Sequence, residues 1–216
     1  MIQGYKLELT SLPEQLHIPL SETDRISADV ISEEVQATLD KGAICRIWRN
    51  PEEGFFLVPK KDGKFRPVVN LRPLNRCIQY RHFKMEGIHI VRDLLKRGDC
   101  MTRMDLKDSY FAVPVHCQHR KYLRFRQKGQ TYEFSCLPFG LAPAPQVSTK
   151  VLKPVVGFLR SMGIRCVIYI DNLLLMHQNR QELTGHIILA LGLLEALGFL
   201  INYPKSQLEP SQIIGL

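Results

Sequence analysis

The segment 167–176 places two polar side chains in an otherwise apolar run. It reads VIYIDNLLLM, and Asp171 and Asn172 are its only strongly polar residues. An ionised carboxylate in such surroundings is costly unless a cation compensates its charge, so Asp171 predicts a positive partner, for which a divalent metal is the natural candidate. Asp and Asn also favour turns, and a plain hairpin turn is the alternative for this segment taken alone.

A second carboxylate, Asp105, closes a short apolar strand expected over residues 101–105. Two carboxylates at the ends of adjacent strands can hold a pair of divalent ions. Such ions activate an attacking hydroxyl and stabilise the leaving oxygen of an in-line phosphoryl displacement. Asp105 and Asp171 together suit that chemistry.

Composition narrows the class of protein. The 216 residues are 45% hydrophobic and 23% charged, as in an ordinary folded domain, which excludes a disordered or fibrous chain. The net charge of +8 favours a polyanionic partner, because clustered Lys and Arg gain affinity by releasing counterions from phosphates. The six cysteines form no C-x-x-C pair, which argues against a zinc ribbon or redox motif and favours a reducing compartment.

The sequence carries no signal for secretion, no apolar stretch long enough for a membrane span and no complete zinc-binding pattern. The N-terminus has no basic start followed by an apolar run, so we expect no secretion. The longest apolar stretch, 187–200, is too short for a membrane span and contains Glu195. We therefore expect an intracellular protein, in the cytoplasm or nucleus, with no membrane partner. His116, Cys117 and His119 lie close together, but a structural zinc site needs further ligands and none follows at suitable spacing.

Hydrophobic periodicity and turn residues predict a mixed set of elements without regular βαβ alternation, which indicates an α+β fold. The expected elements are a helix at 27–41, a hairpin from 55–59 to 65–71 with a basic tip at 60–64, a helix at 88–95, a strand at 101–105, a hairpin at 120–134, a helix at 147–162 bent at Pro154, two strands in 167–176, and a helix at 181–197 capped by Gly198.

Four segments together resemble reverse transcriptases. Residues 169–172, YIDN, resemble their Y-x-D-D motif, and 105–110 resemble their first palm motif. Residues 137–145, LPFGLAPAP, resemble the segment that contacts the templating pair, and 58–67, VPKKDGKFRP, resemble the fingers hairpin of the retrotransposon branch. Residues 83–86, 149–155 and 201–206 look most like DIRS-type, tyrosine-recombinase retrotransposons.

The resemblance implies a right-hand polymerase fold with fingers and palm subdomains, in which an antiparallel palm sheet is flanked by helices and the thumb is absent. The reverse transcriptase domain would fill residues 1–216. The fingers would take about 1–85 and 113–145, and the palm about 86–112 and 146–216. The implied partners are an RNA or DNA template-primer and dNTP, and the implied cofactor is a pair of Mg2+ ions, with Mn2+ as a substitute.

The resemblance also implies catalytic roles. Asp105 and Asp171 would hold the metals, with the backbone carbonyl of Leu106 as a further oxygen ligand. Lys205 matches the lysine that protonates the departing pyrophosphate, although exposed lysines are common. Asn172 stands where the family has a second Asp, and because an amide oxygen carries no charge, metal affinity and rate should both fall.

A further set of residues would surround the incoming nucleotide: Lys60, Lys61, Arg66, Asp108, Ser109, Tyr110, Phe139 and Gly140. Arg66 and one of the two lysines would grip the triphosphate. Tyr110 matches the ring that excludes a 2′-hydroxyl, with an ordinary core aromatic as the alternative. Asp108 fits turn geometry or a capping role better than metal binding.

Two functions follow from these residues. The first is an RNA-directed DNA polymerase core that carries out two-metal nucleotidyl transfer and is impaired by Asn172. The second is a catalytically inactive, nucleic-acid-binding remnant of a retrotransposon polyprotein with the same fold. Primer extension by the unmodified chain distinguishes the two.

Overall fold

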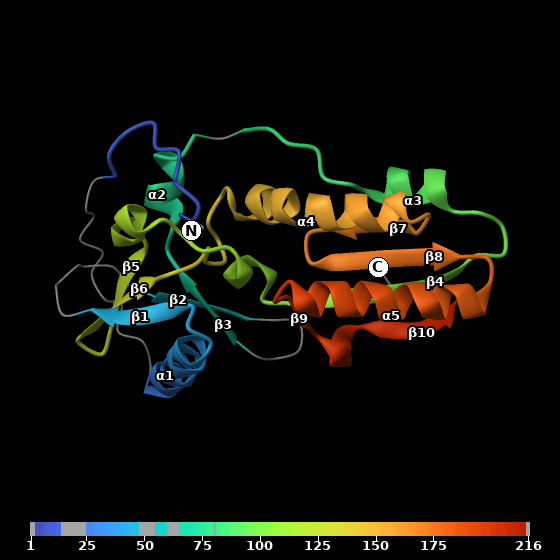
Figure 1. The fold of residues 1–216 in the computed structure, drawn as a ribbon. Coiled ribbons are helices and arrows are strands. Elements are labelled where there is room, and N and C mark those ends of the chain that lie inside the picture. The colour runs from blue at the N-terminus through green and yellow to red at the C-terminus, as the bar shows by residue number, and fades with distance from the viewer. Residues whose placement is uncertain (1–2, 14–24, 48–54, 60–64, 80, 215–216) are drawn as a thin grey trace. The chain divides into compact units, whose positions relative to one another are not determined.

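Two units divide the chain, and each is assembled from two separate stretches of sequence (Figure 1). The first comprises Met1–Arg81 and Val113–Ala144, and the second His82–Ala112 and Pro145–Leu216. The structure, a computed structural model, describes residues 3–13, 25–47, 55–59, 65–79 and 81–214, with the side chains of all of these except 25–30, 55–59, 65–69 and 88.

The first unit contains a three-stranded antiparallel sheet in the order β1-β6-β5, a separate β2-β3 hairpin and two α-helices. Its elements are α1 (Arg25–Asp40), β1 (Ile44–Ile47), β2 (Phe55–Pro59), β3 (Phe65–Val69), α2 (Arg72–Arg76), the 3-10 helix η2 (Cys117–Leu123), β5 (Arg124–Gln127) and β6 (Gln130–Phe134). The predicted spacing of α1 is confirmed, because Ile31 and Val35 are buried.

Aromatic side chains hold the sheet of the first unit together. Phe125 on β5 is fully buried and stacks on Tyr132 of β6, with ring centroids 5.3 Å apart. It also contacts Phe134, at 5.5 Å between centroids. Cross-strand aromatic pairs of this kind stabilise a sheet beyond the area that they bury. The β5-β6 turn uses Gly129 at φ 77°, as the sequence predicts for this hairpin.

The second unit is built on an antiparallel sheet with the strand order β10-β4-β8-β7. Its strands are β4 (Cys100–Lys107), β7 (Arg165–Tyr169), β8 (Asn172–His177) and β10 (Gln207–Ser211), and the short β9 (Leu200–Ile201) pairs with the end of β4. The sequence predicts β4, β7 and β8 but neither β9 nor β10, since these two are short and lack clear alternation.

Helices cover both faces of this sheet (Figure 1). One face packs Met104, Leu106 and Leu173 against α4 (Ala144–Ser161) and α5 (Arg180–Ala196) in the main core. The other face packs Val167, Leu174 and Met176 against α3 (Ile88–Leu94). Because neighbouring residues of a strand point to opposite faces, this division fixes the direction of every side chain on β4 and β8.

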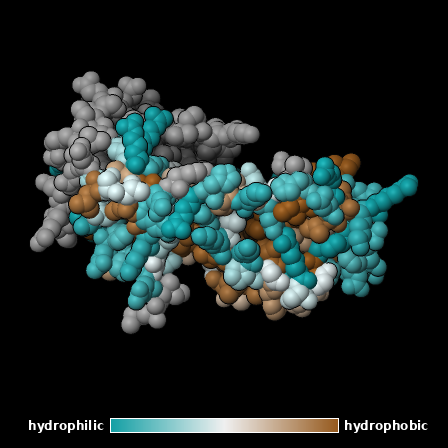
Figure 2. Space-filling model, turned by 90° about the horizontal axis from the view of Figure 1, so that it is seen from above, coloured by the Kyte–Doolittle hydropathy of each residue, from teal (hydrophilic) through white to brown (hydrophobic). Residues whose placement is uncertain are grey.

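Hydrophobic side chains also reach the surface of the second unit (Figure 2). On α4, Val151 and Phe158 are 41% and 52% exposed, and Met162, just after the helix, is 49% exposed. Among the described residues, none of the helices is long and apolar enough to cross a bilayer.

Pro154 lies inside α4, where it donates no main-chain hydrogen bond.

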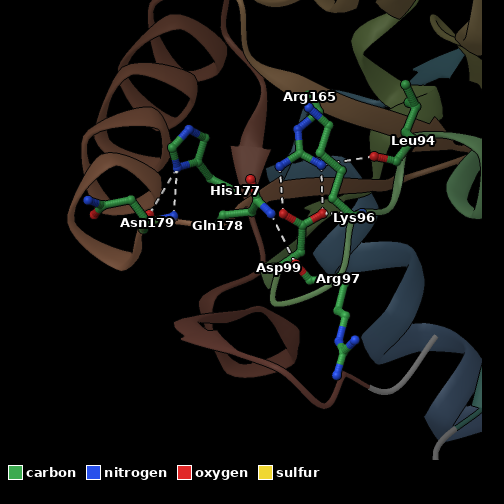
Figure 3. A network of polar contacts seen from close by, with 8 residues as sticks. All are labelled: Leu94, Lys96, Arg97, Asp99, Arg165, His177, Gln178 and Asn179. Carbon is green, nitrogen blue, oxygen red and sulfur yellow. Dashed lines mark hydrogen bonds and ion pairs between the residues drawn. The ribbon is translucent and has the colours of Figure 1, made fainter.

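A buried ion pair ties β7 to the chain that enters β4 (Figure 3). Arg165 donates from Nη2 to Oδ1 of Asp99 and from Nη1 to Oδ2, both at 2.6 Å. The Lys96 amide donates to the same carboxylate at 2.6 Å. Burial by itself raises the pKa of Asp99, but these hydrogen bonds and the charge of Arg165 outweigh it and hold that pKa below its usual value.

Glu86 makes a second link of this type. Its Oε2 accepts from Nη2 of Arg160 on α4 at 2.7 Å and from the Ile168 amide on β7 at 3.1 Å. Arg160 also donates to the Cys166 carbonyl, so α4, β7 and the segment before α3 are joined by polar contacts. Both links fix the strand that leads into the turn carrying Asp171.

Candidate active site

The turn between β7 and β8 contains two residues, Ile170 and Asp171. Tyr169 pairs with Asn172 across it, and Ile170 adopts φ 57° while Asp171 stays at negative φ. A positive φ at the first central position alone is the signature of a type II′ turn, which matches the twist of the flanking strands. A β-branched residue is strained at positive φ, so the surrounding hairpin must hold Ile170 in place.

The end of β4 lies beside this turn. Asp105 is directly opposite Asn172, and the Leu106 amide donates to the main-chain oxygen of Asp171 at 2.7 Å. Residues directly opposite each other share a face, so the side chains of Asp105 and Asn172 lie on the face away from α4 and α5. The structure thus brings together Asp105, Leu106, Asp171 and Asn172, as the sequence predicts from two distant motifs.

The two carboxylates accept hydrogen bonds from neutral amides. Oδ1 of Asp171 accepts from Nδ2 of Asn172 at 2.8 Å, and Oδ1 of Asp105 accepts from Nδ2 of Asn202 at 2.8 Å. Among the described residues, Asp105 makes no ion pair with Lys or Arg. The negative charge of Asp105 is therefore not neutralised by a described side chain.

Oxygen donors at this position suit a hard divalent cation. The Leu106 amide points toward the β7-β8 turn, and the carbonyl of the same residue in an extended strand points to the same side. Two carboxylates, this carbonyl and the Asn172 amide are the oxygen donors offered. In the part of the chain that the structure describes, no group of three or more His, Cys, Asp and Glu side chains is placed to hold a metal.

Asn202 and Ser206 hold Asp105 from the other side. Besides its side-chain contact, Asn202 donates its main-chain amide to the Asp105 carbonyl at 2.8 Å. The Asp105 amide donates to Oγ of Ser206 at 2.9 Å. Sequence reasoning used residues 201–206 only for their resemblance to one retrotransposon group and assigned no role to either residue. The contacts span 97 and 101 positions, so local pattern gives no sign of them.

Lys205 lies on the same turn. It ends the 3-10 helix η3 (Tyr203–Lys205), its side chain is exposed, and its carbonyl accepts from Nη2 of Arg103 on β4 at 3.0 Å. Tyr203 donates its hydroxyl to Oε1 of Glu195 on α5 at 2.7 Å. The turn that carries Lys205 is thus attached to β4 and α5.

Three further predicted residues follow β4. Asp108 adopts φ 51°, and its carbonyl accepts from the Phe111 amide at 2.8 Å as the chain enters the 3-10 helix η1 (Ser109–Ala112). A left-handed conformation is one that Asp tolerates better than most residues. Ser109 is 4% exposed and Tyr110 is 8% exposed, so the Tyr110 ring is largely enclosed by protein.

The remaining predicted residues belong to the first unit. Phe139 is half-buried, and Gly140 is exposed at φ 90°, a conformation that favours glycine. The side chain of Asn75 brackets this loop, because its Nδ2 donates to the Gly140 carbonyl and its Oδ1 accepts from the Ala142 amide, both at 2.9 Å. Sequence reasoning missed Asn75. Lys60 and Lys61 lie outside the described residues, as does the side chain of Arg66, whose backbone is in β3.

Comparison with known proteins identifies the family. A sequence profile described as reverse transcriptase (RNA-dependent DNA polymerase) matches residues 58–215. The chain belongs to the reverse transcriptase family. Curated relatives of this reverse transcriptase chain include the transposon Tf2-7 and Tf2-3 polyproteins of Schizosaccharomyces pombe, each 26% identical over 156 residues, or 72% of the chain. The chain spans 12% of the length of these polyproteins.

Solved structures show the same fold. A foamy viral protease-reverse transcriptase in complex with dsDNA is 18% identical, with a TM-score of 0.81 over 98% of this chain and 44% of that one. A second foamy viral complex with DNA is 19% identical, with a TM-score of 0.78 over 92% of this chain and 34% of that one. The predicted α+β fold with antiparallel sheets flanked by helices, as in the fingers and palm of a reverse transcriptase, is confirmed.

Proposed function

We propose that the chain is the polymerase core of a retrotransposon RNA-directed DNA polymerase, acting on an RNA or DNA template-primer and dNTP. The observation that supports this function best is the register of β4 and β8. It sets Asp105 opposite Asn172, while the Leu106 amide holds the main chain of Asp171 beside them. The main chains of two acidic residues from distant segments then lie side by side, an arrangement that would suit two-metal nucleotidyl transfer.

The residues at this position fit Mg2+, or Mn2+ in its place, because all of their donors are oxygens. Asp105, Asp171 and the Leu106 carbonyl would hold two ions. Such ions supply activation of the primer 3′-hydroxyl and stabilisation of the leaving oxygen. Lys205, exposed on η3, would donate a proton to the departing pyrophosphate.

Contacts to the nucleotide are proposed on the motif positions. Arg66 and one of Lys60 and Lys61 would bind the triphosphate, near the backbone amides of Asp108 and Ser109. The buried ring of Tyr110 would exclude a 2′-hydroxyl, because an enclosed ring cannot move aside to admit one. Phe139 and Gly140 would border the base and sugar, in the loop that Asn75 holds by two hydrogen bonds.

The assignment extends to subdomains, subgroup and compartment. We propose that the first unit corresponds to the fingers and the second to the palm, and that the element is of the DIRS type, from residues 83–86, 149–155 and 201–206. All six cysteines are free, which favours a reducing, intracellular compartment. Template-primer binding is supported by the net charge of +8.

One contact favours a second candidate, a catalytically inactive nucleic-acid-binding remnant. The Nδ2 group of Asn172 donates to Oδ1 of Asp171, where the family has a carboxylate that would repel its neighbour unless a cation lay between them. Asn172 thus provides a hydrogen-bond donor to the Asp171 carboxylate without a metal. A chain of this kind would bind template-primer with strong salt dependence and incorporate no nucleotide.

Primer extension with Asn172→Asp separates these functions. We expect weak, Mg2+- or Mn2+-dependent extension by the unmodified chain, an increase of roughly 10-fold or more in Asn172→Asp, and none in Asp105→Ala. Asn179→Asp is the matched control. It makes the same change of charge at the N-cap of α5, where Asp and Asn serve equally well, and should leave extension unchanged.

One result would contradict the proposal, and another would exclude the alternative. If Asn172→Asp folds and binds template-primer yet incorporates nothing, the polymerase function is wrong for this chain. If the unmodified chain extends a primer, the inactive remnant is excluded instead.

A further inference from the structure

The turn at residues 202–206 forms hydrogen bonds with the main-chain amide, the main-chain carbonyl and the carboxylate of Asp105. Asn202 bonds both the Asp105 carbonyl and Oδ1 of its side chain, each at 2.8 Å. The Asp105 amide donates a hydrogen bond to Oγ of Ser206 at 2.9 Å. One short segment, almost a hundred residues away in sequence, therefore holds Asp105 at its amide, its carbonyl and its carboxylate.

Asn202 is itself rigidly placed. Its carbonyl accepts hydrogen bonds from the Lys205 amide at 3.0 Å, from the Ser206 amide at 2.9 Å and from Oγ of Ser206 at 2.9 Å. Arg103, two residues before Asp105, attaches the same turn to β4 through the Lys205 carbonyl. With the backbone fixed at both ends, the Asn202 side chain has little freedom to leave the carboxylate that it bonds.

The type of side chain matters as much as its position. An Asp side chain rotates about its last torsion through a broad, two-fold range, so a hydrogen bond to one oxygen fixes the plane of the carboxylate and the direction of its other oxygen. A Lys or Arg would also fix that orientation, but its charge would compete with a cation for the carboxylate. The amide of Asn202 orients Oδ1 and leaves the negative charge of Asp105 intact.

We infer that Asn202 is a positioning residue for the Asp105 carboxylate, supported by Ser206, and that the turn carrying Lys205 is built around this contact. The inference rests on the proposed function, since it concerns the side chain that would hold the metal. Partners that orient a metal ligand commonly change metal affinity by about 10-fold to 100-fold when they are removed. Truncation of Asn202 should therefore weaken cation binding with the fold intact.

The test is direct Mn2+ binding to the full chain without template or nucleotide, measured by the electron paramagnetic resonance signal of free Mn2+. Asp105→Asn defines which binding belongs to this site. We expect Asn202→Ala to raise the Kd of that binding about 10-fold, and Ser206→Ala to raise it by less, since Ser206 contacts only the main chain of Asp105. Thermal melting of each variant reports whether it is folded.

Tyr203→Phe is the matched control. It removes one side-chain hydrogen bond from the same turn, the one to Glu195, and leaves every contact with Asp105 in place. Its Mn2+ affinity should equal that of the unmodified chain. Equal weakening by Tyr203→Phe and Asn202→Ala would mean that the turn matters only for general stability, which would overturn the inference.

Two other outcomes separate this inference from the proposed function. If Asp105→Asn abolishes Mn2+ binding while Asn202→Ala binds as tightly as the unmodified chain, or more tightly, the positioning role is wrong and the metal site stands. If the unmodified chain and Asp105→Asn bind Mn2+ equally, no cation is held by Asp105, and both the inference and the polymerase proposal are wrong.

Discussion

Replacement of Asp99 by alanine should strongly destabilise the second unit. The Asp99 side chain is 1% exposed and accepts three hydrogen bonds of 2.6 Å, two from Arg165 and one from the Lys96 amide. After the change, the hydrogen bond that Arg165 retains among the described residues is the one to the Leu94 carbonyl, at 2.9 Å. The guanidinium, whose side chain is 18% exposed, is then left largely buried without its counter-charge.

The magnitude follows from that burial. Removal of one partner from a buried ion pair costs about 3–5 kcal/mol, because the remaining charge stays desolvated. For a chain of this length, 1 kcal/mol corresponds to a shift of about 2–4 °C in Tm, so Asp99→Ala should lower Tm by about 6–20 °C. The free energy of unfolding is measured by urea denaturation followed by circular dichroism.

An exposed pair in the same unit is the control. Arg180 and Glu209 form an ion pair of 2.8 Å, but their side chains are 59% and 84% exposed. Glu209→Ala should therefore cost no more than about 1 kcal/mol. A loss in Asp99→Ala as small as that in Glu209→Ala would refute the argument that burial gives the Asp99 contact its strength.

Three further changes have defined outcomes. Because folding lowers the pKa of Asp99, its contribution to stability is present above pH of about 4 and is lost as the pH falls through the folded pKa. The free energy of unfolding, measured by urea titration at pH 7 and pH 3, should therefore differ less between the two pH values in Asp99→Asn than in the unmodified chain. Ile170→Gly should relieve about 1–2 kcal/mol of strain at φ 57°, offset by about 0.5–1 kcal/mol because glycine adds entropy to the unfolded state. The free energy of unfolding from urea denaturation should therefore stay the same or rise slightly, and a decrease would contradict this. Asn75→Ala removes both hydrogen bonds to the Gly140 loop and should cost about 1–3 kcal/mol, with faster hydrogen exchange at the Ala142 amide as the readout and no change if the loop is held otherwise.

Much of the second unit could be predicted from sequence because its signals are local. The apolar run around Asp171 and Asn172 predicts two strands and a tight turn, and β7 and β8 form there. Gly198 adopts φ 83° after α5, as expected of a residue that ends a helix. The approach of Asp105 to Asp171 is a long-range contact that the sequence predicts from two adjacent strand ends. In the structure Asp171 lies in the turn between β7 and β8, and β4 continues for two residues beyond Asp105.

The residues that hold the site could not be found in this way. Asn202, Ser206 and Asn75 are ordinary polar residues in turns, and nothing in their neighbourhoods distinguishes a side chain that bonds a distant strand from one that faces water. The Asp99–Arg165 pair has the same character, since 66 residues separate its members. Strand β1 was missed because its four residues, ICRI, carry too short a pattern.

The division of the chain also distributes the residues of the proposed site between the two units. Asp105, Asp171 and Asn172, together with the turn that holds Asp105, all come from the second unit, while Phe139, Gly140 and the basic hairpin positions come from the first. Under the proposed function, a change of charge at position 172 would leave Phe139, Gly140 and the basic hairpin positions of the first unit unaltered. One codon change at position 172 would then be enough to lower the proposed catalysis, and the reverse change would be enough to restore it.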